Sequence, residues 1–554
     1  MKVLLTAINA KYIHSNLAVY SLRAYAGKYA QQTEIAEYTI NQTMDDILSD
    51  IYRKKPDILC LSCYLWNILY VEQLITEIHK VLPKMQIWLG GPEVSYNAVS
   101  VMEQYPQVTG VMCGEGEETF LELMEYWNQE RESLDTIKGI VYRENGTCRQ
   151  NPPRPVMDLS KVPFVYDHIE DFQNKIIYYE SSRGCPFSCS YCLSSIDKCL
   201  RFRNLELVKK ELQFFIDHEV PQVKFVDRTF NCKHSHSMAI WTYLKEHDRG
   251  KTNFHFEVAA DLLNEEEMEL IASMRPGLIQ LEIGIQSTNP ETITEIRRKM
   301  NFEEVKRIVK RVQEKGNVHQ HLDLIAGLPY EDYERFAQSF RDVYALHPEQ
   351  LQLGFLKVLK GSYMHEKTED YQLLYQDRPP FEVLSTKWLS YDDVIRLKGV
   401  EEMVEVYYNM RMIIGPNRLP VDDLPAAMAQ GGDTVQKMQS FFPDLELRPQ
   451  AMKLLSEQFP QLIQSISLPT NLELNAPGAT KGDALEALCR HLGLDLLEAA
   501  AFGDGTNDLT MIQKAGVGVA MANAAPDVLQ CADLVAPSNR EDGVAQILEQ
   551  WFPG

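Results

Sequence analysis

Short apolar segments alternate with helix-like segments along the first part of this 554-residue chain. In residues 1–135 the apolar segments are VLLTAI, DILCLSCYL, QIWLGG and GVMCG, and amphipathic patterns such as VEQLITEIHKVL separate them. This alternation predicts parallel βαβ units in an open, doubly wound, Rossmann-like sheet. Ligands of such sheets bind beyond the carboxyl ends of the strands, which here lead into loops 9–16, 62–67, 90–95 and 114–118. The glycines in these loops either let the backbone approach a large ligand closely or only form tight turns.

A second alternating stretch runs from residue 175 to about 361. Its candidate strands are KIIYYESS, VKFVD, FHFEVAA, LIQLEIGIQS, VHQHLDLIAG and LQLGFLKVL. Six parallel units in one run favour a partial or full α/β barrel with functional residues at the strand ends. Between the two stretches, TIKGIVYRENGTCR predicts a β-hairpin that turns at Asn145-Gly146.

The expected organisation is therefore α/β throughout. We expect a Rossmann-like domain over 1–135, a hairpin and linker over 136–172, a barrel over 173–365, a helical extension over 366–409 and a further α/β segment over 410–554.

Composition excludes several classes of function. The chain has 55 basic and 78 acidic residues, a formal charge of −23, so bulk attraction to nucleic acid or anionic lipid is not expected. The start, MKVLLTAINA, lacks the apolar run of a signal peptide, and no apolar stretch reaches the length of a membrane span. Eleven cysteines in such a chain favour metal or redox chemistry over disulfides, and we expect a cytoplasmic protein.

Three cysteines, Cys185, Cys189 and Cys192, follow a candidate strand in SRGCPFSCSYC. Three thiolates on one short loop can hold three irons of a four-iron four-sulfur cluster and leave the fourth iron open to a small molecule's amine and carboxylate. A zinc site is one alternative, but it needs a fourth ligand, and Cys199 has an unusual spacing. The other alternative, three unrelated buried thiols, is disfavoured by the Gly, Pro and Ser content of the loop.

The C-x3-C-x2-C spacing after a first barrel strand resembles the radical S-adenosylmethionine (SAM) superfamily. The resemblance implies reductive cleavage of S-adenosylmethionine at a 4Fe-4S cluster, which releases a 5′-deoxyadenosyl radical. It also implies SAM-binding roles, each with the alternative of an ordinary strand-end turn or surface charge, for Tyr191, Asp227, Glu257, Gln286, Ser287, Arg297 and Gly327.

A doubly wound domain, a hairpin and then a radical barrel resemble the cobalamin-binding class of that superfamily, over residues 1 to about 405. The resemblance implies a corrin between the two domains. The loop residues that it points to are Asn9, His14, Ser62, Gly90, Gly91 and Glu115. The D-x-H-x-x-G motif of a cobalt-ligating histidine is absent, so we expect His14, in KYIHSN, to be a loop residue.

Cys60, Cys63 and Cys113 offer a different hypothesis, a second cluster as in methylthiotransferases. Cys60 and Cys63 are separated by an odd number of positions in an apolar strand, so their side chains are expected on opposite faces. Burial in the core is the expected role of these thiols.

The last part of the chain resembles Cof-type haloacid dehalogenase (HAD) hydrolases. The residues that carry the resemblance are Lys481 and, in GDGTND, Asp504, Asn507 and Asp508. The resemblance implies a magnesium site, and two carboxylates four apart on a glycine turn suit such a hard cation. No two aspartates in the whole chain stand two apart, so the D-x-D nucleophile loop is missing. We expect an incomplete, inactive HAD-like segment.

The leading hypothesis is a cobalamin-dependent radical SAM enzyme that transfers a methyl group to a carbon centre of a small-molecule or natural-product substrate. Its electron donor would be a flavodoxin or ferredoxin, and no nucleic acid or membrane partner is expected. The alternatives are radical chemistry without methyl transfer, such as cyclisation or sulfur insertion, a non-catalytic cobalamin or iron–sulfur sensor, and a HAD-type phosphatase, which the missing nucleophile disfavours.

Overall fold

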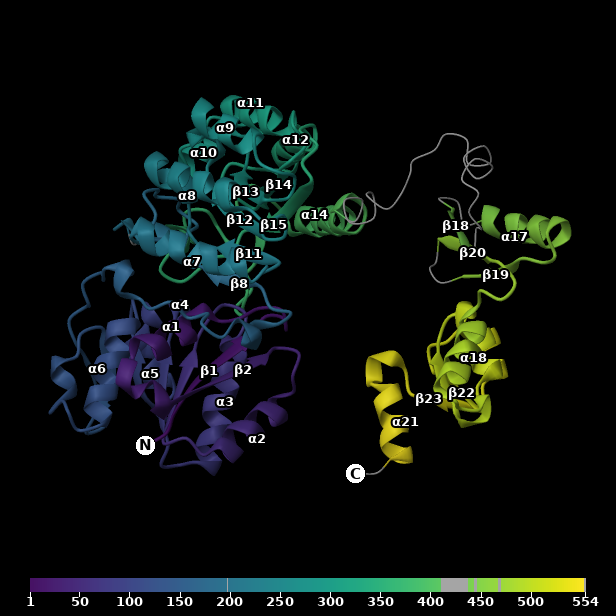
Figure 1. Cartoon of the computed structure of the whole chain (residues 1–554), viewed down its shortest axis with the longest axis horizontal. Helices are drawn as coiled ribbons and strands as arrows, with labels where there is room; N and C mark the ends of the chain where they lie inside the picture. Colours follow the sequence, from purple (N-terminus) through teal and green to yellow (C-terminus); the bar gives the residue numbers. More distant parts are fainter. Residues whose placement is uncertain (197, 410–436, 443–445, 467–469, 553–554) are drawn as a thin grey trace. The chain divides into compact units, whose positions relative to one another are not determined.

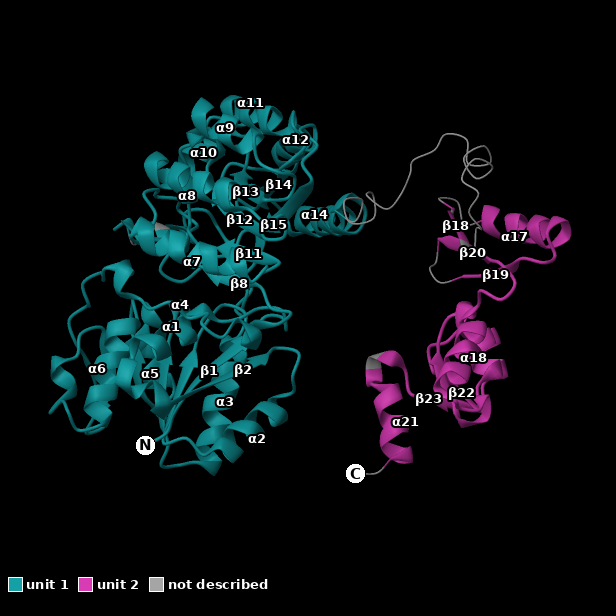
Figure 2. Ribbon diagram, in the orientation of Figure 1, with its two compact units in different colours: residues 1–419 teal, residues 420–554 magenta. Residues whose placement is uncertain are grey.

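The computed structural model describes residues 1–196, 198–409, 437–442, 446–466 and 470–552 (Figure 1). The chain divides into two compact units, residues 1–419 and 420–554 (Figure 2). The boundary expected near 410 adjoins residues 410–436, which lie outside the described part.

The first sheet is doubly wound, as the sequence predicts. Its parallel strands have the order β2-β1-β3-β4-β5, so the strand order reverses between β1 and β3. A hairpin of β6 and β7 with the expected Asn145-Gly146 turn continues the sheet antiparallel from β5. The bounds are β1 (Val3–Asn9), β2 (Thr33–Thr39), β3 (Ile58–Ser62), β4 (Gln86–Gly90), β5 (Val108–Met112), β6 (Ile140–Glu144) and β7 (Thr147–Gln150).

Helices cover both faces of this sheet because its central strands are apolar on both sides. All seven residues of β1 are buried. One core lies under α2, α3 and α5 and contains Cys63, while the other lies under α1 and α6 and contains Cys60. The two thiols therefore face opposite sides, as expected. The helices are α1 (Leu17–Tyr25), α2 (Met44–Lys54), α3 (Ile68–Val81), α4 (Pro92–Ser95), α5 (Ala98–Gln104) and α6 (Glu117–Trp127).

The second sheet is a partial barrel. Six parallel strands have the order β8-β11-β12-β13-β14-β15, and the described residues show no pairing between the edge strands β8 and β15. The strands are β8 (Ile177–Tyr179), β11 (Gln222–Phe225), β12 (Asn253–Val258), β13 (Ile279–Gln286), β14 (His319–Ala326) and β15 (Gln350–Phe355). The helices are α7 (Leu205–Asp217), α8 (His234–His247), α9 (Glu265–Ala272), α10 (Pro290–Glu295), α11 (Phe302–Gln313), α12 (Tyr333–Tyr344), α13 (Tyr363–Glu366) and α14 (Tyr391–Met403).

Residues 420–554 form a smaller unit with two short sheets. An antiparallel sheet has the order β18-β20-β19, and a parallel sheet has the order β21-β22-β23. The strands are β18 (Lys437–Phe441), β19 (Ile463–Ser465), β20 (Asn471–Asn475), β21 (Ala500–Gly503), β22 (Val517–Met521) and β23 (Leu534–Ala536). The helices are α17 (Leu447–Gln458), α18 (Lys481–Leu492), α19 (Leu509–Lys514), α20 (Pro526–Cys531) and α21 (Gly543–Trp551).

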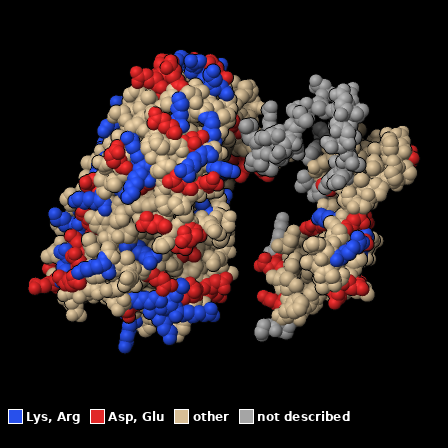
Figure 3. Space-filling model, in the orientation of Figure 1, with Lys and Arg blue, Asp and Glu red and all other residues tan. Residues whose placement is uncertain are grey.

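The surface carries both signs of charge in close mixture. Figure 3 shows basic and acidic side chains interspersed over the visible face of residues 1–419. Among the described helices, none combines the length and the apolar composition needed to cross a bilayer.

A buried ion pair joins the linker, the first barrel strand and α7. Arg203 donates through Nη2 and Nε to the two carboxylate oxygens of Glu211, at 2.6 and 2.9 Å, and through Nη1 to the carbonyl of Leu159 at 2.7 Å. The Tyr179 hydroxyl donates to the same carboxylate at 2.6 Å. Both carboxylate oxygens of Glu211 thus have hydrogen-bond partners, which is the condition under which a buried charge is tolerated.

We expect Arg203→Ala to destabilise the chain by about 3–5 kcal/mol, because it leaves the Glu211 carboxylate buried and uncompensated. Urea unfolding of the full chain measures this. Lys209→Ala, which removes an exposed partner of Glu206 on the same helix, is the matched control and should change stability by no more than about 0.5 kcal/mol. Equal effects of the two substitutions would contradict the assignment.

Candidate active site

The three cysteines lie on a loop between two short strands, β9 (Ser182–Arg183) and β10 (Arg201–Phe202). Cys185 and Cys189 are each 8% exposed, and Cys192 is half-buried. Gly184 has φ +91°, and a Cβ there would stand 2.6 Å from the Cys199 carbonyl oxygen, so the loop closes only with glycine.

Two backbone hydrogen bonds fix the middle of this loop. The Ser190 amide donates to the Ile296 carbonyl at 2.9 Å, and the Met364 amide donates to the Ser190 carbonyl at 2.8 Å. Segments that follow β13 and β15 therefore hold the cysteine loop in place.

The cysteines are not arranged around one ion. Within the described ranges, the only group of three metal-ligand side chains whose donor atoms all lie within 4.8 Å of one another is Glu282, His321 and Asp323. Ligands of a tetrahedral zinc ion would meet that spacing, whereas the sulfurs of a four-iron cluster bind separate irons and stand further apart.

A cavity of about 140 Å³ opens beside the cysteine loop at the carboxyl ends of the barrel strands. It brings together three of the residues expected from the sequence, Cys189, Glu257 and Gln286. It also contains residues that the sequence analysis missed, namely Phe187, Arg228, Thr229, Val258, Ala259, Glu282, Gly284, Arg298, Lys299 and Asp323. Polar residues at alternate positions of strands with buried neighbours were the signal that could have found Glu282 and Asp323.

Arg298 connects the cavity to the cysteine loop. Its Nη1 donates to the Tyr191 hydroxyl at 3.3 Å and lies 3.9 Å from Cys189 Sγ, and its Nη2 donates to the Gly284 carbonyl. Burial raises the pKa of the Cys189 thiol, and the guanidinium of Arg298 opposes that rise. The cavity contains Arg298, together with Arg228 and Lys299, whereas the expected Arg297 lies over the Tyr363 ring, 3.5 Å from its centroid.

Three other expected residues lie outside the cavity lining. Asp227 is fully buried and accepts hydrogen bonds from the Ser181 amide and hydroxyl, at 2.8 and 2.6 Å, and from the Ser182 hydroxyl at 2.7 Å. Ser287 donates to Glu331 at 2.7 Å, and Gly327 packs against Val383. Asp227 therefore holds the start of the cysteine loop, and Ser287 and Gly327 serve the turns after their strands.

Two residues of the cavity can accept further hydrogen bonds from a ligand. Gln286 Oε1 is buried without a hydrogen-bond partner. Burial, with Glu282 nearby, raises the pKa of Glu257 to about 7, so this carboxyl can be neutral or charged near neutral pH. A ligand that carries N–H or O–H donors would satisfy both side chains.

The loops at the carboxyl edge of the Rossmann-like sheet meet the barrel. His14 Nδ1 lies 2.5 Å from the Tyr178 hydroxyl on β8, and burial lowers its pKa. Arg183, on β9, lies 3.2 Å from Glu115 and 2.7 Å from Glu117. His14 and Glu115 thus hold the two domains together.

The remaining expected residues of this edge have mostly local partners. Asn9 Nδ2 donates to the His14 carbonyl at 3.1 Å, and the Ser62 hydroxyl accepts from Asn16 Nδ2 at 3.3 Å. Gly91, after Gly90, has φ +119°, and a Cβ there would stand 2.4 Å from the Cys63 carbonyl oxygen, so the glycine is required by the β3–β4 packing itself.

Large apolar side chains remain exposed on the same edge. Tyr12, Ile13 and Trp66 are 66%, 44% and 44% exposed. The Trp66 indole N–H donates to the Ile8 carbonyl at 3.0 Å, and its ring stacks on Tyr64. Exposed apolar groups on two adjacent loops suit a large ligand that covers them.

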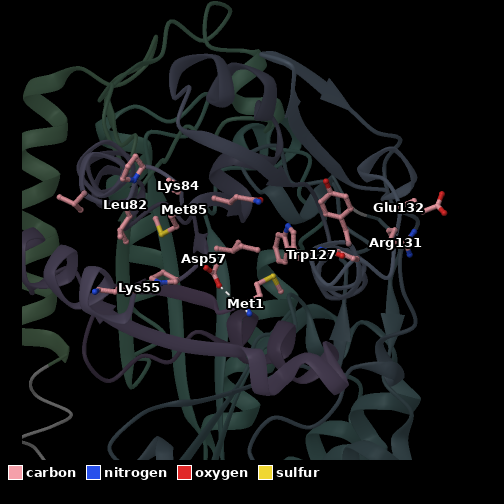
Figure 4. Close-up of a pocket in the computed structure, with 16 residues that line it drawn as sticks. Met1, Lys55, Asp57, Leu82, Lys84, Met85, Trp127, Arg131 and Glu132 are labelled. Atoms are coloured by element: carbon pink, nitrogen blue, oxygen red, sulfur yellow. Dashed lines mark ion pairs between the residues drawn. The ribbon is translucent and has the colours of Figure 1, made fainter.

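A larger cavity, of about 890 Å³, lies at the opposite end of the same sheet. Figure 4 shows Met1, Lys55 and Asp57 beside Leu82, Met85 and Trp127, with an ion pair between the chain's amino group and Asp57. The first five of these residues precede strands β1, β3 and β4, and Trp127 ends α6, so this cavity is not the one formed by the loops at the carboxyl edge.

The HAD-like residues also come together. Lys481, at the start of α18, contacts Asp508 Oδ1, and the Asp508 Oδ2 atom accepts from the Asp504 and Gly505 amides at 3.0 and 3.1 Å. Asp504 Oδ2 accepts from Asn523 and from Asn539, each at 3.3 Å. Asn507 lies within the same turn, Thr506–Asp508.

Comparisons with known protein families divide the chain as its folds do. Residues 3–124 match the B12 binding domain, residues 179–343 the radical SAM superfamily, and residues 421–548 the haloacid dehalogenase-like hydrolases. Residues 369–414 match a family of unknown function.

Curated relatives are distant in the first two domains. An uncharacterized methyltransferase of Pyrococcus horikoshii is 26% identical over 64% of this chain and 77% of its own length. The cobalamin-dependent radical SAM methyltransferase TokK of Streptomyces tokunonensis is 25% identical over 59% of this chain, which spans 51% of TokK. The structure of the radical SAM methyltransferase TsrM from Kitasatospora setae aligns with a TM-score of 0.55 at 16% identity, over 69% of this chain and 80% of TsrM, and so shares the fold.

The last segment has closer but shorter matches. A Bacillus subtilis phosphatase of 5-amino-6-(5-phospho-D-ribitylamino)uracil is 45% identical over 85 residues, which are 15% of this chain and 34% of the phosphatase. The chain therefore spans about a third of that relative.

The pH dependence of stability should report the environment of Asp227. Burial raises the pKa of the Asp227 carboxyl from 3.8 to about 6. Between pH 3.8 and pH 6 this carboxyl is mostly ionised in the unfolded chain and mostly protonated in the folded chain. Its titration therefore destabilises the fold increasingly as the pH rises through this range. Asp227→Asn lacks this titration. We expect the stability of the variant relative to wild type to rise by up to about 3 kcal/mol from pH 4 to pH 7, measured by urea unfolding. A difference that stays constant over this range would contradict the assignment.

Proposed function

We propose that this chain is a cobalamin-dependent radical SAM methyltransferase acting on a carbon centre of a small molecule, because it is a radical SAM protein with an N-terminal B12-binding domain. The observation that supports this most is the position of the cysteine loop. It lies at the mouth of an open barrel, beside a polar cavity, and the B12-binding domain contacts the same end of the barrel through Arg183 and Tyr178.

The chain's residues fit the three groups that this function needs. When bound, the 4Fe-4S cluster supplies an electron to S-adenosylmethionine, and cobalamin supplies the methyl group. We assign Cys185, Cys189 and Cys192 to the cluster, since three cysteines on one short loop suit three iron ligands and two backbone hydrogen bonds hold that loop in place.

The cavity side chains fit S-adenosylmethionine by their unsatisfied groups. The orphaned Gln286 Oε1 and the Glu257 carboxyl accept hydrogen bonds, which suits the ammonium and hydroxyl groups of that molecule. Arg298 and Arg228 offer positive charge to its carboxylate. Of the expected residues, Tyr191 serves by positioning Arg298, and Asp227 by positioning the loop.

At the carboxyl edge of the Rossmann-like sheet, the exposed side chains of Tyr12, Ile13 and Trp66 suit contact with the corrin. His14 contacts the Tyr178 hydroxyl and is therefore not assigned as a cobalt ligand. A flavodoxin or ferredoxin would provide the electron. A chain with eleven cysteines suits the reducing cytoplasm that we expect for such an enzyme.

We also propose that the HAD-like segment is catalytically inactive. Its lysine and acidic pair are in place, but no aspartate pair of the D-x-D type exists in the chain to supply the nucleophile. Its parallel sheet has three strands in the described residues, and the matched phosphatase is covered over only 34% of its length.

Cys189→Ala should abolish cluster assembly, because a four-iron cluster needs all three protein thiolates. After anaerobic reconstitution we expect about four irons per wild-type chain and absorbance near about 400 nm, both lost in the variant. Cys199→Ala, an exposed cysteine on the same loop, is the control and should keep both. Iron retained by Cys189→Ala, or zinc in place of iron in the wild type, would refute the cluster.

The full chain should not hydrolyse p-nitrophenyl phosphate with Mg²⁺ above the rate of the blank, because the nucleophile is missing. Asp504→Ala should therefore leave that background unchanged. Magnesium-dependent turnover that the substitution removes would show that the segment is an active phosphatase.

A further inference from the structure

The inner face of the partial barrel is mostly polar. In β13, Leu281, Ile283 and Ile285 are buried against the helices, while the alternate residues are partly exposed on the other face. The same alternation holds in the neighbouring strands. The residues of this inner face include Lys224, His255, Glu257, Gln280, Glu282, Gln286, His319, His321, Asp323, Gln350 and Gln352. A barrel interior that is merely packed is filled by branched apolar residues, so this one is built around something polar.

Three of these side chains converge. Glu282 and His321 are register partners on adjacent strands, and Asp323 follows His321 by two residues and so shares its face. One donor atom from each of the three lies within 4.8 Å of the other two.

The contacts inside this cluster are unusual for hydrogen bonds. His321 Nε2 lies at an ion-pair distance of 3.0 Å from Asp323 Oδ1, and neither atom makes a hydrogen bond of good geometry in the described residues. His321 is 5% exposed, so no bulk water replaces the missing partner. Two ligands on adjacent positions around one ion, with bonds of about 2.1 Å, stand about 3.0 Å apart and point at the ion rather than at each other.

We propose that Glu282, His321 and Asp323 bind one divalent transition-metal ion, separate from the iron–sulfur cluster. One imidazole nitrogen and two carboxylates suit an ion such as Mn²⁺, Fe²⁺ or Zn²⁺. Three protein ligands leave coordination positions open, and Glu282 and Asp323 line the cavity beside the cysteine loop. A substrate whose oxygen or nitrogen atom occupies an open position would be held at the barrel mouth.

Two neighbouring side chains contact the Glu282 carboxylate and affect the charge of this site. Lys224 Nζ donates to Glu282 Oε2 at 3.0 Å, and His255 Nε2 lies 2.9 Å from the same oxygen. The ammonium neutralises the carboxylate when no ion is bound and competes with the ion for it. Lys224 is partly exposed and long, so it can withdraw.

Manganese binding to the full-length, cluster-reconstituted chain tests the site. The parent protein carries Asp504→Asn and Asp508→Asn, so that the C-terminal carboxylates do not contribute. Mn²⁺ is titrated anaerobically, and the free ion is measured from its EPR sextet at room temperature.

We expect the parent to bind one Mn²⁺ per chain. His321→Gln and Asp323→Asn should each raise the dissociation constant by at least about tenfold, and Lys224→Met should lower it. His319→Gln is the matched control on the same strand and should titrate like the parent. Cluster absorbance and urea midpoint verify that each variant is folded.

A parent that leaves all the Mn²⁺ free would overturn the proposal, as would His321→Gln and Asp323→Asn variants that titrate like it. Weaker binding by Lys224→Met would mean that the lysine supports the cluster rather than competes with the ion, and would also contradict it. The measurement reads bound manganese and not methyl transfer, so its outcome is independent of the proposed function.

Discussion

Parallel pairing of β8 and β11–β15 places the carboxyl ends of all six strands at one edge. The cysteine loop follows β8, Arg228 follows β11, and Gln286 and Arg298 lie at and after the end of β13. Cys189 and Arg298, which both line this cavity, are 109 positions apart in the chain, and the shared strand direction brings them together. The helical layer packs the opposite, apolar face and leaves the inner face free for polar side chains.

The B12-binding domain contacts the barrel at the carboxyl edge of its sheet. Arg183 reaches Glu115 and Glu117, Lys175 reaches Glu37 at 2.7 Å, and His14 reaches Tyr178. Partly buried charged pairs of this kind specify orientation more than they stabilise, because desolvation offsets much of their attraction. The arrangement positions the two ligand edges against each other, which is what a reaction between two cofactors requires.

In the C-terminal segment, the residues of the HAD-like motif are held together by local contacts. The GDGTND turn, Lys481 and the following β22 are arranged by contacts within the same unit, such as the hydrogen bonds from the Asp504 and Gly505 amides to Asp508 and those between Thr506 and Ile466. Its buried clusters are small, with four buried residues in each of two groups. The short-range geometry of the motif is present, and the chain has no aspartate pair of the D-x-D type.

The amino-acid sequence alone determined the features that depend on near neighbours: the βαβ alternation, the hairpin turn, the opposite faces of Cys60 and Cys63, and the loop that carries three cysteines. Tertiary structure decided which side chains enter the cavity. Arg297 has φ +56° and lies over the Tyr363 ring, so the adjacent Arg298 takes the inward position. The Asp227 carboxylate accepts hydrogen bonds from two serines and does not line the cavity. Spacing along the chain cannot predict these outcomes, because they depend on strand register and on the backbone path of turns, which distant contacts set.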